Sequence, residues 1–256
     1  MAGCSLVTRA GVALYYEAAV LPASQIVRNL CYTAASPCDT PKHTLDLYRP
    51  AAASWPVIVF VHGGNWNSGD KNYRAGGADV YANIGRFYAG RGIGVAVINY
   101  RLQPGVPEAS QVDDVRAAVA WVRGNISGYG GHPDRIFLMG HSAGTQLSAL
   151  AALSTADSGV RGVIAVSGAS LEGAARAAHP PAPPFLVLYA TGESQALQRQ
   201  SQMLHTALTA AGASSTLVPV TGESHTRMVL ALSHPGKLPA KAILDFIRSG
   251  GVALPP

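Results

Sequence analysis

The sequence has little charge and no long apolar run. Charged residues make up 13% of the 256 residues, in no block of one sign, whereas 48% are hydrophobic. No apolar stretch reaches the length of about 18 residues that a membrane-spanning helix needs. The 28 glycines and 17 prolines are spread along the chain. These absences argue against a disordered chain, a repeat protein or a membrane-spanning protein, and they favour one large domain with a sizeable core.

The basic residues are not clustered either. The 19 lysines and arginines give a net charge of +5, but they are scattered along the chain without interleaved aromatic residues. Nucleic-acid grooves combine clustered basic side chains with stacking aromatics, so we expect no nucleic-acid partner. His, Cys and Asp residues at zinc-ligand spacing are absent. We therefore expect no metal and no organic cofactor.

The sequence contains three cysteines. In "MAGCS", Ala2 and Gly3 precede Cys4 as small residues precede the lipidated cysteine of a bacterial lipoprotein signal, although the apolar part of such a signal is missing and chance is the alternative. Cys31 and Cys38 predict a small surface disulfide, the alternative being two reduced cysteines in a cytoplasmic enzyme. Together these features predict the periplasm or cell surface, with a membrane anchor at lipidated Cys4; the cytoplasm is the alternative.

Short runs rich in β-branched or aromatic residues alternate with helical patterns, which predicts an α/β fold. The predicted strands are 43–50, 56–62, 93–100, 135–140, 162–168, 185–190 and 215–220. Apolar residues at spacings of three and four predict helices within 111–126, 197–211 and 243–247. We expect a mostly parallel central sheet with helices on both faces and the functional site at the carboxyl ends of the strands. We divide the chain into an N-terminal segment, residues 1–42, and a catalytic domain, residues 43–256.

The sequence "GHSAG" at 140–144 lies between the apolar run "RIFLM" and the helical pattern "TQLSALAAL". A tight turn from a strand into a helix needs small neighbours, and Gly140 and Gly144 supply them. Such a turn holds Ser142 out at the edge of the sheet. The position predicts that Ser142 is a nucleophile.

A serine nucleophile needs hydrogen-bond donors for the oxyanion of its tetrahedral intermediate. The stretch "FVHGGNW" at 60–66 ends a predicted strand, and its two glycines allow backbone N–H groups to face the serine. We predict that the N–H groups of Gly64, Asn65 and Ala143 form the oxyanion hole, with His62 bracing the loop. An ordinary glycine turn is the alternative.

The serine also needs a general base and an acid that orients the base. His225 in "TGESHTRMV" follows the last predicted strand and is expected in a loop at the same sheet edge as Ser142, with His234 as the reserve candidate. Glu193 follows the preceding strand, with Glu223 as its rival. The chain order is then nucleophile, acid, base, as in α/β-hydrolases.

Several stretches together resemble one known family. "HGGNW", "AVINYRL", "DDVRAAVAWVRGNI", "GGHPDRIFLMGHSAG" and "SHTRMV" look like the carboxylesterase and feruloyl-esterase-like branch of the α/β-hydrolase superfamily, which also contains kynurenine formamidase. The similarity covers roughly residues 43–248. The stretch 192–201 is similar to the formamidase pattern, which supports Glu193 as the acid, although the family acid is usually Asp. The matching residues Arg101 and Asp114 are interpreted as scaffold.

The resemblance implies a carboxylesterase with a small-molecule ester substrate. The residues themselves predict that it acts through a Ser-His-Glu triad, Ser142, His225 and Glu193, and an acyl-enzyme. The segment 168–184 is short and rich in small residues, so we predict that no large lid covers the site. We therefore expect a preference for short-chain or aromatic esters, with Trp66 as a substrate-binding residue. The alternatives are an arylformamidase, a feruloyl esterase, or a ligand-binding module on a hydrolase fold. The sequence leaves the oligomeric state open.

Overall fold

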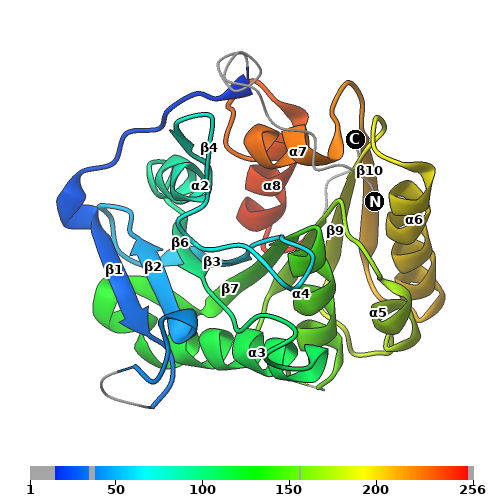
Figure 1. Ribbon diagram of the computed structural model, residues 1–256, viewed down its shortest axis with the longest axis horizontal. Coiled ribbons are helices and arrows are strands. Elements are labelled where there is room, and N and C mark those ends of the chain that lie inside the picture. The colour runs from blue at the N-terminus through cyan, green and yellow to red at the C-terminus, as the bar shows by residue number, and fades with distance from the viewer. Residues whose placement is uncertain (1–14, 35–37, 156, 253–256) are drawn as a thin grey trace.

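The computed structural model describes residues 15–34, 38–155 and 157–252. Cys4, and with it the predicted lipid attachment, lies outside the described residues. Within them, no helix is both long enough and apolar enough to cross a membrane. Figure 1 shows one large sheet with helices packed around it.

The central sheet has eight strands in the order β1-β2-β6-β3-β7-β8-β9-β10. Their bounds are β1 (Ile26–Cys31), β2 (Thr44–Tyr48), β3 (Trp55–Val61), β6 (Gly94–Ile98), β7 (Gly131–His141), β8 (Gly162–Val166), β9 (Phe185–Ala190) and β10 (Ser215–Val220). From β6 to β10 the neighbouring strands run parallel, while β1 and β2 pair antiparallel at one edge. The predicted mostly parallel sheet and its seven strands are confirmed.

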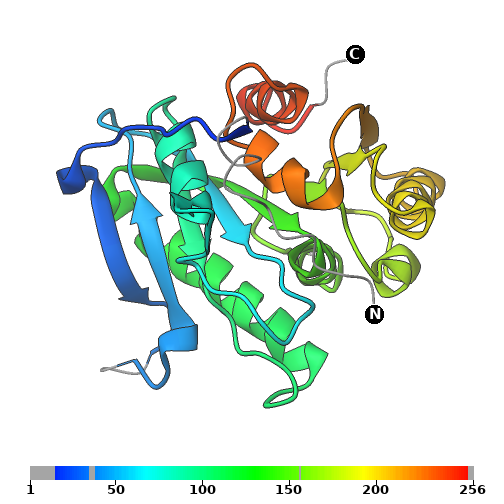
Figure 2. The same ribbon diagram turned by 45° about the horizontal axis from the view of Figure 1, so that its top comes forward.

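The helices cover both faces of this sheet, as the sequence predicts (Figure 2). Their bounds are α2 (Val80–Ala89), α3 (Glu108–Asn125), α4 (Ala143–Leu153), α5 (Glu172–Arg176), α6 (Gln195–Ala210), α7 (His225–Ala231) and α8 (Leu238–Arg248). A separate hairpin pairs β4 (Arg74–Ala75) with β5 (Ala78–Asp79). Buried side chains of α3, α4, α5 and α6 pack on one face of the sheet, and those of α2, α7 and α8 on the other.

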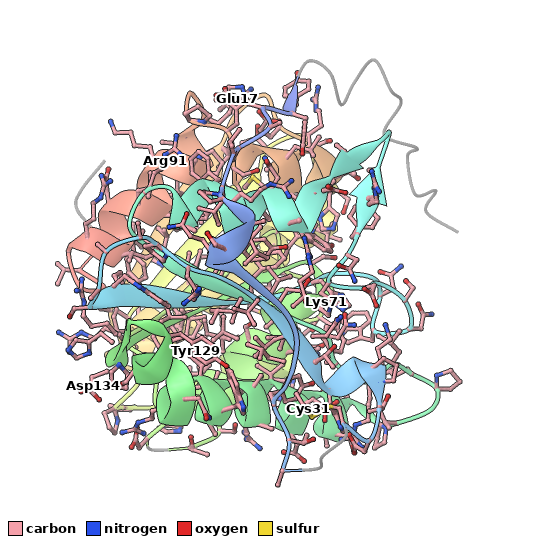
Figure 3. The ribbon with its side chains drawn as sticks, turned by 90° about the vertical axis from the view of Figure 1, so that its left-hand side faces the viewer. Glu17, Cys31, Lys71, Arg91, Tyr129 and Asp134 are labelled. Atoms are coloured by element: carbon pink, nitrogen blue, oxygen red, sulfur yellow. A yellow bond between two sulfur atoms is a disulfide. The ribbon has the colours of Figure 1, made fainter. Side chains whose placement is uncertain are left out.

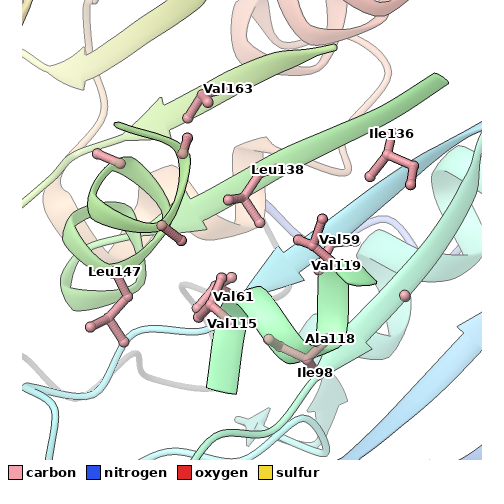
Figure 4. Packing of buried hydrophobic residues seen from close by; sticks show 14 of the residues in the cluster. Val59, Val61, Ile98, Val115, Ala118, Val119, Ile136, Leu138, Leu147 and Val163 are labelled. Carbon is pink, nitrogen blue, oxygen red and sulfur yellow. The ribbon is translucent and has the colours of Figure 1, made fainter. Parts of the chain in front are cut away.

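The central strands are buried on both faces, which explains their almost wholly apolar sequences. Every residue of β3, β8 and β9 is buried. On one face, Val59 and Leu138 pack against Val115 and Leu147 of the helices (Figure 4). Successive strand residues point to opposite faces, so the same strands supply both halves of the core.

β1 is absent from the predicted strands, although part of the N-terminal segment 1–42 forms it. Its register shifts between Val27 and Leu30, where the adjacent residues Arg28 and Asn29 are both exposed. This irregularity breaks the alternation by which a strand is recognised in a sequence. Cys31, at the end of β1, is joined to Cys38 by a disulfide (Figure 3).

Candidate active site

Ser142 occupies a sharp turn between the end of β7 and the start of α4. Its φ of 56° and ψ of −122° lie outside the regions that side-chain-bearing residues usually adopt. A Cβ atom at Gly140 would clash with the backbone of Gly144, and one at Gly144 would clash with the carbonyl of Val61. The two glycines of "GHSAG" are therefore required by the close approach of β3, β7 and α4, and the turn presents Ser142 at the sheet edge.

Ser142, His225 and Glu193 form a continuous hydrogen-bonded chain. His225 Nε2 lies 3.0 Å from Ser142 Oγ, and His225 Nδ1 lies 3.0 Å from Glu193 Oε2. A carboxylate can only accept, so Nδ1–H donates to Glu193 and Nε2 is left to accept the serine hydroxyl proton. The side chain of Glu193 is fully buried, whereas that of His225 is 29% exposed. The imidazole of His225 is thus held by a buried carboxylate on one side and is partly exposed to solvent.

His225 does not lie in a loop, as the sequence analysis expects, but is the first residue of α7. Ser224 caps this helix by accepting a hydrogen bond from the Arg227 N–H. The polar residues of "TGESHT" read as a loop because α7 has only seven residues, too few for a clear helical period. His225 thus lies at the predicted edge of the sheet, but it lies in a helix and not in the predicted loop.

The rival acid and the reserve base have other partners. Glu223 is buried, with Oε1 2.8 Å from Lys237 Nζ and Oε2 3.9 Å from Arg227 Nε. His234 Nε2 lies 4.0 Å from a carboxylate oxygen of Glu17. The Glu223 carboxylate therefore belongs to an ion-paired cluster beside α7.

The loop after β3 lies directly against Ser142. A Cβ atom added to Gly63 would be 3.1 Å from Ser142 Cβ, which measures how closely the loop backbone approaches the serine. Gly64 has a φ of 133° and Asn65 a φ of 50°, so the backbone reverses here through positive φ values. The N–H groups of Gly64, Asn65 and Ala143 donate no hydrogen bond to any residue in the described part of the chain.

His62 is buried beneath this loop. Its Nδ1–H donates to the Gly63 carbonyl at 2.7 Å, and its ring stacks on Tyr100 with centroids 4.3 Å apart. The Tyr100 hydroxyl in turn donates to the His62 carbonyl at 2.9 Å. Burial lowers the pKa of His62 to about 4. These contacts hold the start of the loop, the bracing that the sequence predicts for this side chain.

His141, the residue before Ser142, contacts His225. Its Nε2–H donates to the backbone carbonyl of His225 at 3.1 Å, and the two rings lie 5.0 Å apart. Burial, with a smaller contribution from His225, lowers the pKa of His141 to about 3. His141 therefore stays neutral, and it joins the serine turn to the start of α7.

Trp66 is partly buried and its indole makes a specific polar contact. The Nε1–H group donates to Gln146 Oε1 at 2.6 Å, and Gln146 Nε2 donates to Glu108 Oε2 at 3.0 Å. Gln146 and Glu108 are functional candidates that no sequence pattern indicates. A hydrogen bond between residues 80 positions apart leaves no local pattern in a sequence.

Arg101 and Asp114 form an ion pair next to the active-site edge. Arg101 Nη2 lies 2.6 Å from Asp114 Oδ1, and the same carboxylate is 3.2 Å from the buried His43 Nε2. The Asp114 carboxylate also accepts the backbone N–H of Arg101 at 2.9 Å. These contacts join the chain after β6 to α3. Within the described residues, no group of three or more His, Cys, Asp or Glu side chains is arranged to hold a metal.

A cavity of about 420 Å³ lies between α3 and α4, away from the triad residues, and is lined in part by Arg116 and Arg123. Arg116 is paired with Asp113 and Arg123 with Asp157, at 2.9 and 3.3 Å. Both guanidinium groups thus already have carboxylate partners. The Ser142 turn, and not this cavity, carries the candidate chemistry.

A mostly parallel sheet with a Gly-x-Ser-x-Gly turn between a strand and a helix is the arrangement of the α/β-hydrolase fold. The BD-FAE family model matches residues 45–177, more than half of this chain, and the chain belongs to that family.

The relatives of this chain are named esterases. The isoprenylcysteine alpha-carbonyl methylesterase ICME of Arabidopsis thaliana is 38% identical over 140 residues, covering 54% of this chain and 30% of that protein. Esterase LipQ of Mycobacterium tuberculosis is 29% identical over 236 residues, covering 75% of this chain and 55% of that protein. The chain spans less than a third of the length of the plant methylesterases it matches.

Solved structures of esterases share the fold. A truncated carbohydrate esterase from gut microbiota superimposes with a TM-score of 0.76 at 20% identity, covering 90% of this chain and 99% of that chain. Esterase B from Lactobacillus rhamnosis gives a TM-score of 0.75 at 20% identity, covering 94% and 89%. The α/β-hydrolase fold expected from the sequence is thereby confirmed.

Proposed function

We propose that this chain is a serine carboxylesterase that acts through an acyl-enzyme. The observation that carries the proposal is the chain of two 3.0 Å hydrogen bonds from Ser142 through His225 to Glu193. A serine hydroxyl is a weak nucleophile unless a base accepts its proton. The strained turn presents the hydroxyl, and the imidazole of His225 lies within hydrogen-bond distance of it. The esterase names among the relatives support the proposal.

In the proposed reaction His225 takes the proton of Ser142 Oγ as the oxygen attacks the ester carbonyl. The buried Glu193 carboxylate stabilises the imidazolium that forms. The backbone N–H groups of Gly64, Asn65 and Ala143 receive the oxyanion, a contribution of about 3 kcal/mol for each donor in related sites. His225 then protonates the leaving alcohol, and it activates the water that hydrolyses the acyl-enzyme.

We further propose that the substrates are short-chain or aromatic carboxylic esters. Within the described part of segment 168–184, the structure contains only the five-residue helix α5. A segment of that size offers little to cover a long acyl chain. The fold-related Est2 of Thermogutta terrifontis has been solved with butyrate and with propionate, which supports small acyl groups. The ring of Trp66 supplies an apolar surface on the loop beside Ser142.

We also propose that the protein resides in the bacterial periplasm or at the cell surface. The Cys31–Cys38 disulfide supports an oxidising location such as the periplasm or cell surface, because thiols stay reduced in most cytoplasms. We expect denatured protein to show two more titratable thiols after reduction than before. Equal thiol counts before and after would contradict the disulfide and remove this support.

The test is hydrolysis of p-nitrophenyl esters from acetate to palmitate, together with methyl ferulate and N-formylkynurenine. We expect turnover of short or aromatic esters by the wild type and its loss in Ser142→Ala. The matched control is Ser214→Ala, an exposed serine in the described chain, which should keep full activity. Faster turnover of N-formylkynurenine than of every ester would favour an arylformamidase. A well-folded wild type without turnover would instead favour a ligand-binding module.

A further inference from the structure

Trp66 is held in an unusual backbone conformation. Its φ is 62°, and that of the preceding Asn65 is 50°. Positive φ is rare and strained for a bulky residue, so it persists only where surrounding contacts enforce it. Here the Trp66 carbonyl accepts hydrogen bonds from the Gln103 N–H at 2.9 Å and from Gln111 Nε2 at 2.7 Å. The backbone of Trp66 is thus fixed from the side of α3.

The indole of Trp66 is fixed separately, from α4. Gln146 lies in the first turn of this helix (Ala143–Leu153), which begins directly after Ser142. Gln146 is 5% exposed and accepts the indole N–H at 2.6 Å. The indole is therefore tied to the first turn of α4, the helix that begins directly after Ser142.

Glu108 sets the orientation of the Gln146 amide. Its carboxylate can only accept, so the Gln146 NH2 group must face Glu108 and the amide oxygen must face Trp66. The NH2 group donates to Glu108 Oε2 at 3.0 Å. Glu108 is exposed at the start of α3. Gln146 is buried and lies between its two hydrogen-bond partners, Trp66 and Glu108. The three side chains form a hydrogen-bonded chain that runs from solvent to the loop beside Ser142.

We propose that Gln146, oriented by Glu108, is a positioning residue that fixes the Trp66 ring as a rigid wall of the substrate site. The inference rests on the proposed esterase function and identifies what controls its selectivity. Because Gln146 occupies the indole N–H, Trp66 presents its apolar ring to a substrate. Groups that contact this ring are selected by shape and apolar contact. Without Gln146, the partly buried indole N–H has no acceptor, which is unfavourable. We expect the ring then to move to a position where the N–H is hydrogen-bonded again.

The test compares substrates with and without a ring. The kcat/KM of p-nitrophenyl acetate and of methyl ferulate is measured beside that of ethyl butyrate, followed by acid release. For Gln146→Leu we expect the ratio of ring-bearing to ring-free kcat/KM to fall at least tenfold, mainly through KM, while the value for ethyl butyrate changes less than threefold. A ratio within threefold of wild type would overturn the proposal, as would an equal loss on all three esters.

Two further variants separate positioning from packing. In Gln146→Glu the carboxylate faces Glu108, and we expect the same loss of selectivity. The double variant Gln146→Glu with Glu108→Gln restores a donor opposite an acceptor, and we expect the ratio to return to within threefold of wild type. If the double variant has the wild-type urea midpoint but does not regain the selectivity ratio, the proposed role of the Glu108–Gln146–Trp66 hydrogen bonds is overturned.

A double-mutant cycle identifies Trp66 as the residue through which Gln146 acts. Trp66→Phe keeps a ring but has no N–H donor, so adding Gln146→Leu to it should lower the selectivity ratio no further. Independent, multiplying losses would contradict the proposal. The matched controls are Asp113→Asn, an exposed carboxylate on α3, and Gln202→Leu, an exposed glutamine on α6. If the wild type hydrolyses no ester, the proposed function fails; if it does and only the ratios stay unchanged, this inference alone fails.

Discussion

The two buried histidines of the site predict a steep loss of stability in mild acid. An unperturbed histidine titrates near pH 6.5, whereas burial lowers the pKa of His62 to about 4 and that of His141 to about 3. Between pH 6.5 and 4 the unfolded chain therefore carries two protons that the folded chain does not. Stability is present above pH 6.5 and falls as the pH is lowered, because protons then favour the unfolded state.

The magnitude follows from the two shifts. Each pKa unit is worth about 1.4 kcal/mol, so between pH 7 and pH 5 each histidine removes about 2 kcal/mol of unfolding free energy. Together they remove about 4 kcal/mol, which is a large part of the roughly 5 to 15 kcal/mol that stabilises a typical domain. His141→Gln keeps a donor for the His225 carbonyl but cannot be protonated. We expect this variant to lose about 2 kcal/mol less than wild type over the same pH interval.

The assay is urea unfolding at pH 7 and pH 5, read by circular dichroism so that it does not depend on catalysis. The quantity compared is the change in unfolding free energy between the two pH values, because Gln at position 141 also alters packing at both. His132→Gln, outside the core, controls for losing a histidine as such. An unchanged pH dependence in His141→Gln would refute the reasoning and indicate that His141 is protonated in the folded protein near pH 5.

Three other substitutions test the site and its support. Glu193→Gln should lower kcat on a short ester by about 10⁴-fold with little change in KM, because the amide no longer holds the tautomer that His225 needs; a loss below tenfold would argue against Glu193 as the acid. Gly144→Ala should yield little folded protein, since its Cβ meets the backbone of β3; a wild-type urea midpoint would contradict the tight turn. Lys71, beside β2 in Figure 3, lies 2.7 Å from Asp46, and both side chains are at most 2% exposed. Lys71→Met should cost about 3 kcal/mol in urea unfolding, and an unchanged midpoint would show that the buried pair adds no stability.

Much of the site can be predicted from the sequence because its signals are local. Ser142 lies between two glycines at a strand-to-helix boundary, and Glu193 and His225 follow the ends of β9 and β10. In a parallel sheet those ends meet at one edge. A few neighbouring residues at each of the three positions are therefore enough to predict that these side chains lie at the same edge of the sheet.

Contacts elsewhere around the site have no such local signal. The hydrogen bonds from Trp66 to Gln146 and from Gln146 to Glu108 span 80 and 38 positions. They depend on how the loop after β3 packs between α3 and α4. The spacing of apolar residues along the sequence does not predict that packing. The sequence does not predict β1 because its register shift breaks the alternation of a strand, and it does not predict α7 because seven residues are too few for a clear helical period.

The use of Glu rather than Asp places a specific demand on the fold. Glu193 has one more rotatable bond than Asp, so its carboxylate is oriented only if the surrounding chain removes that freedom. The structure does this in two ways. The side chain is fully buried, and the Gly192 N–H donates to the Glu223 carbonyl at 3.0 Å, which ties the acid-bearing loop to the residues just before His225. The His141 side chain donates to the His225 carbonyl at 3.1 Å. Hydrogen bonds thus join the Ser142 turn and the Glu193 loop to the segment around His225, and the Glu193 carboxylate lies at hydrogen-bond distance from the imidazole.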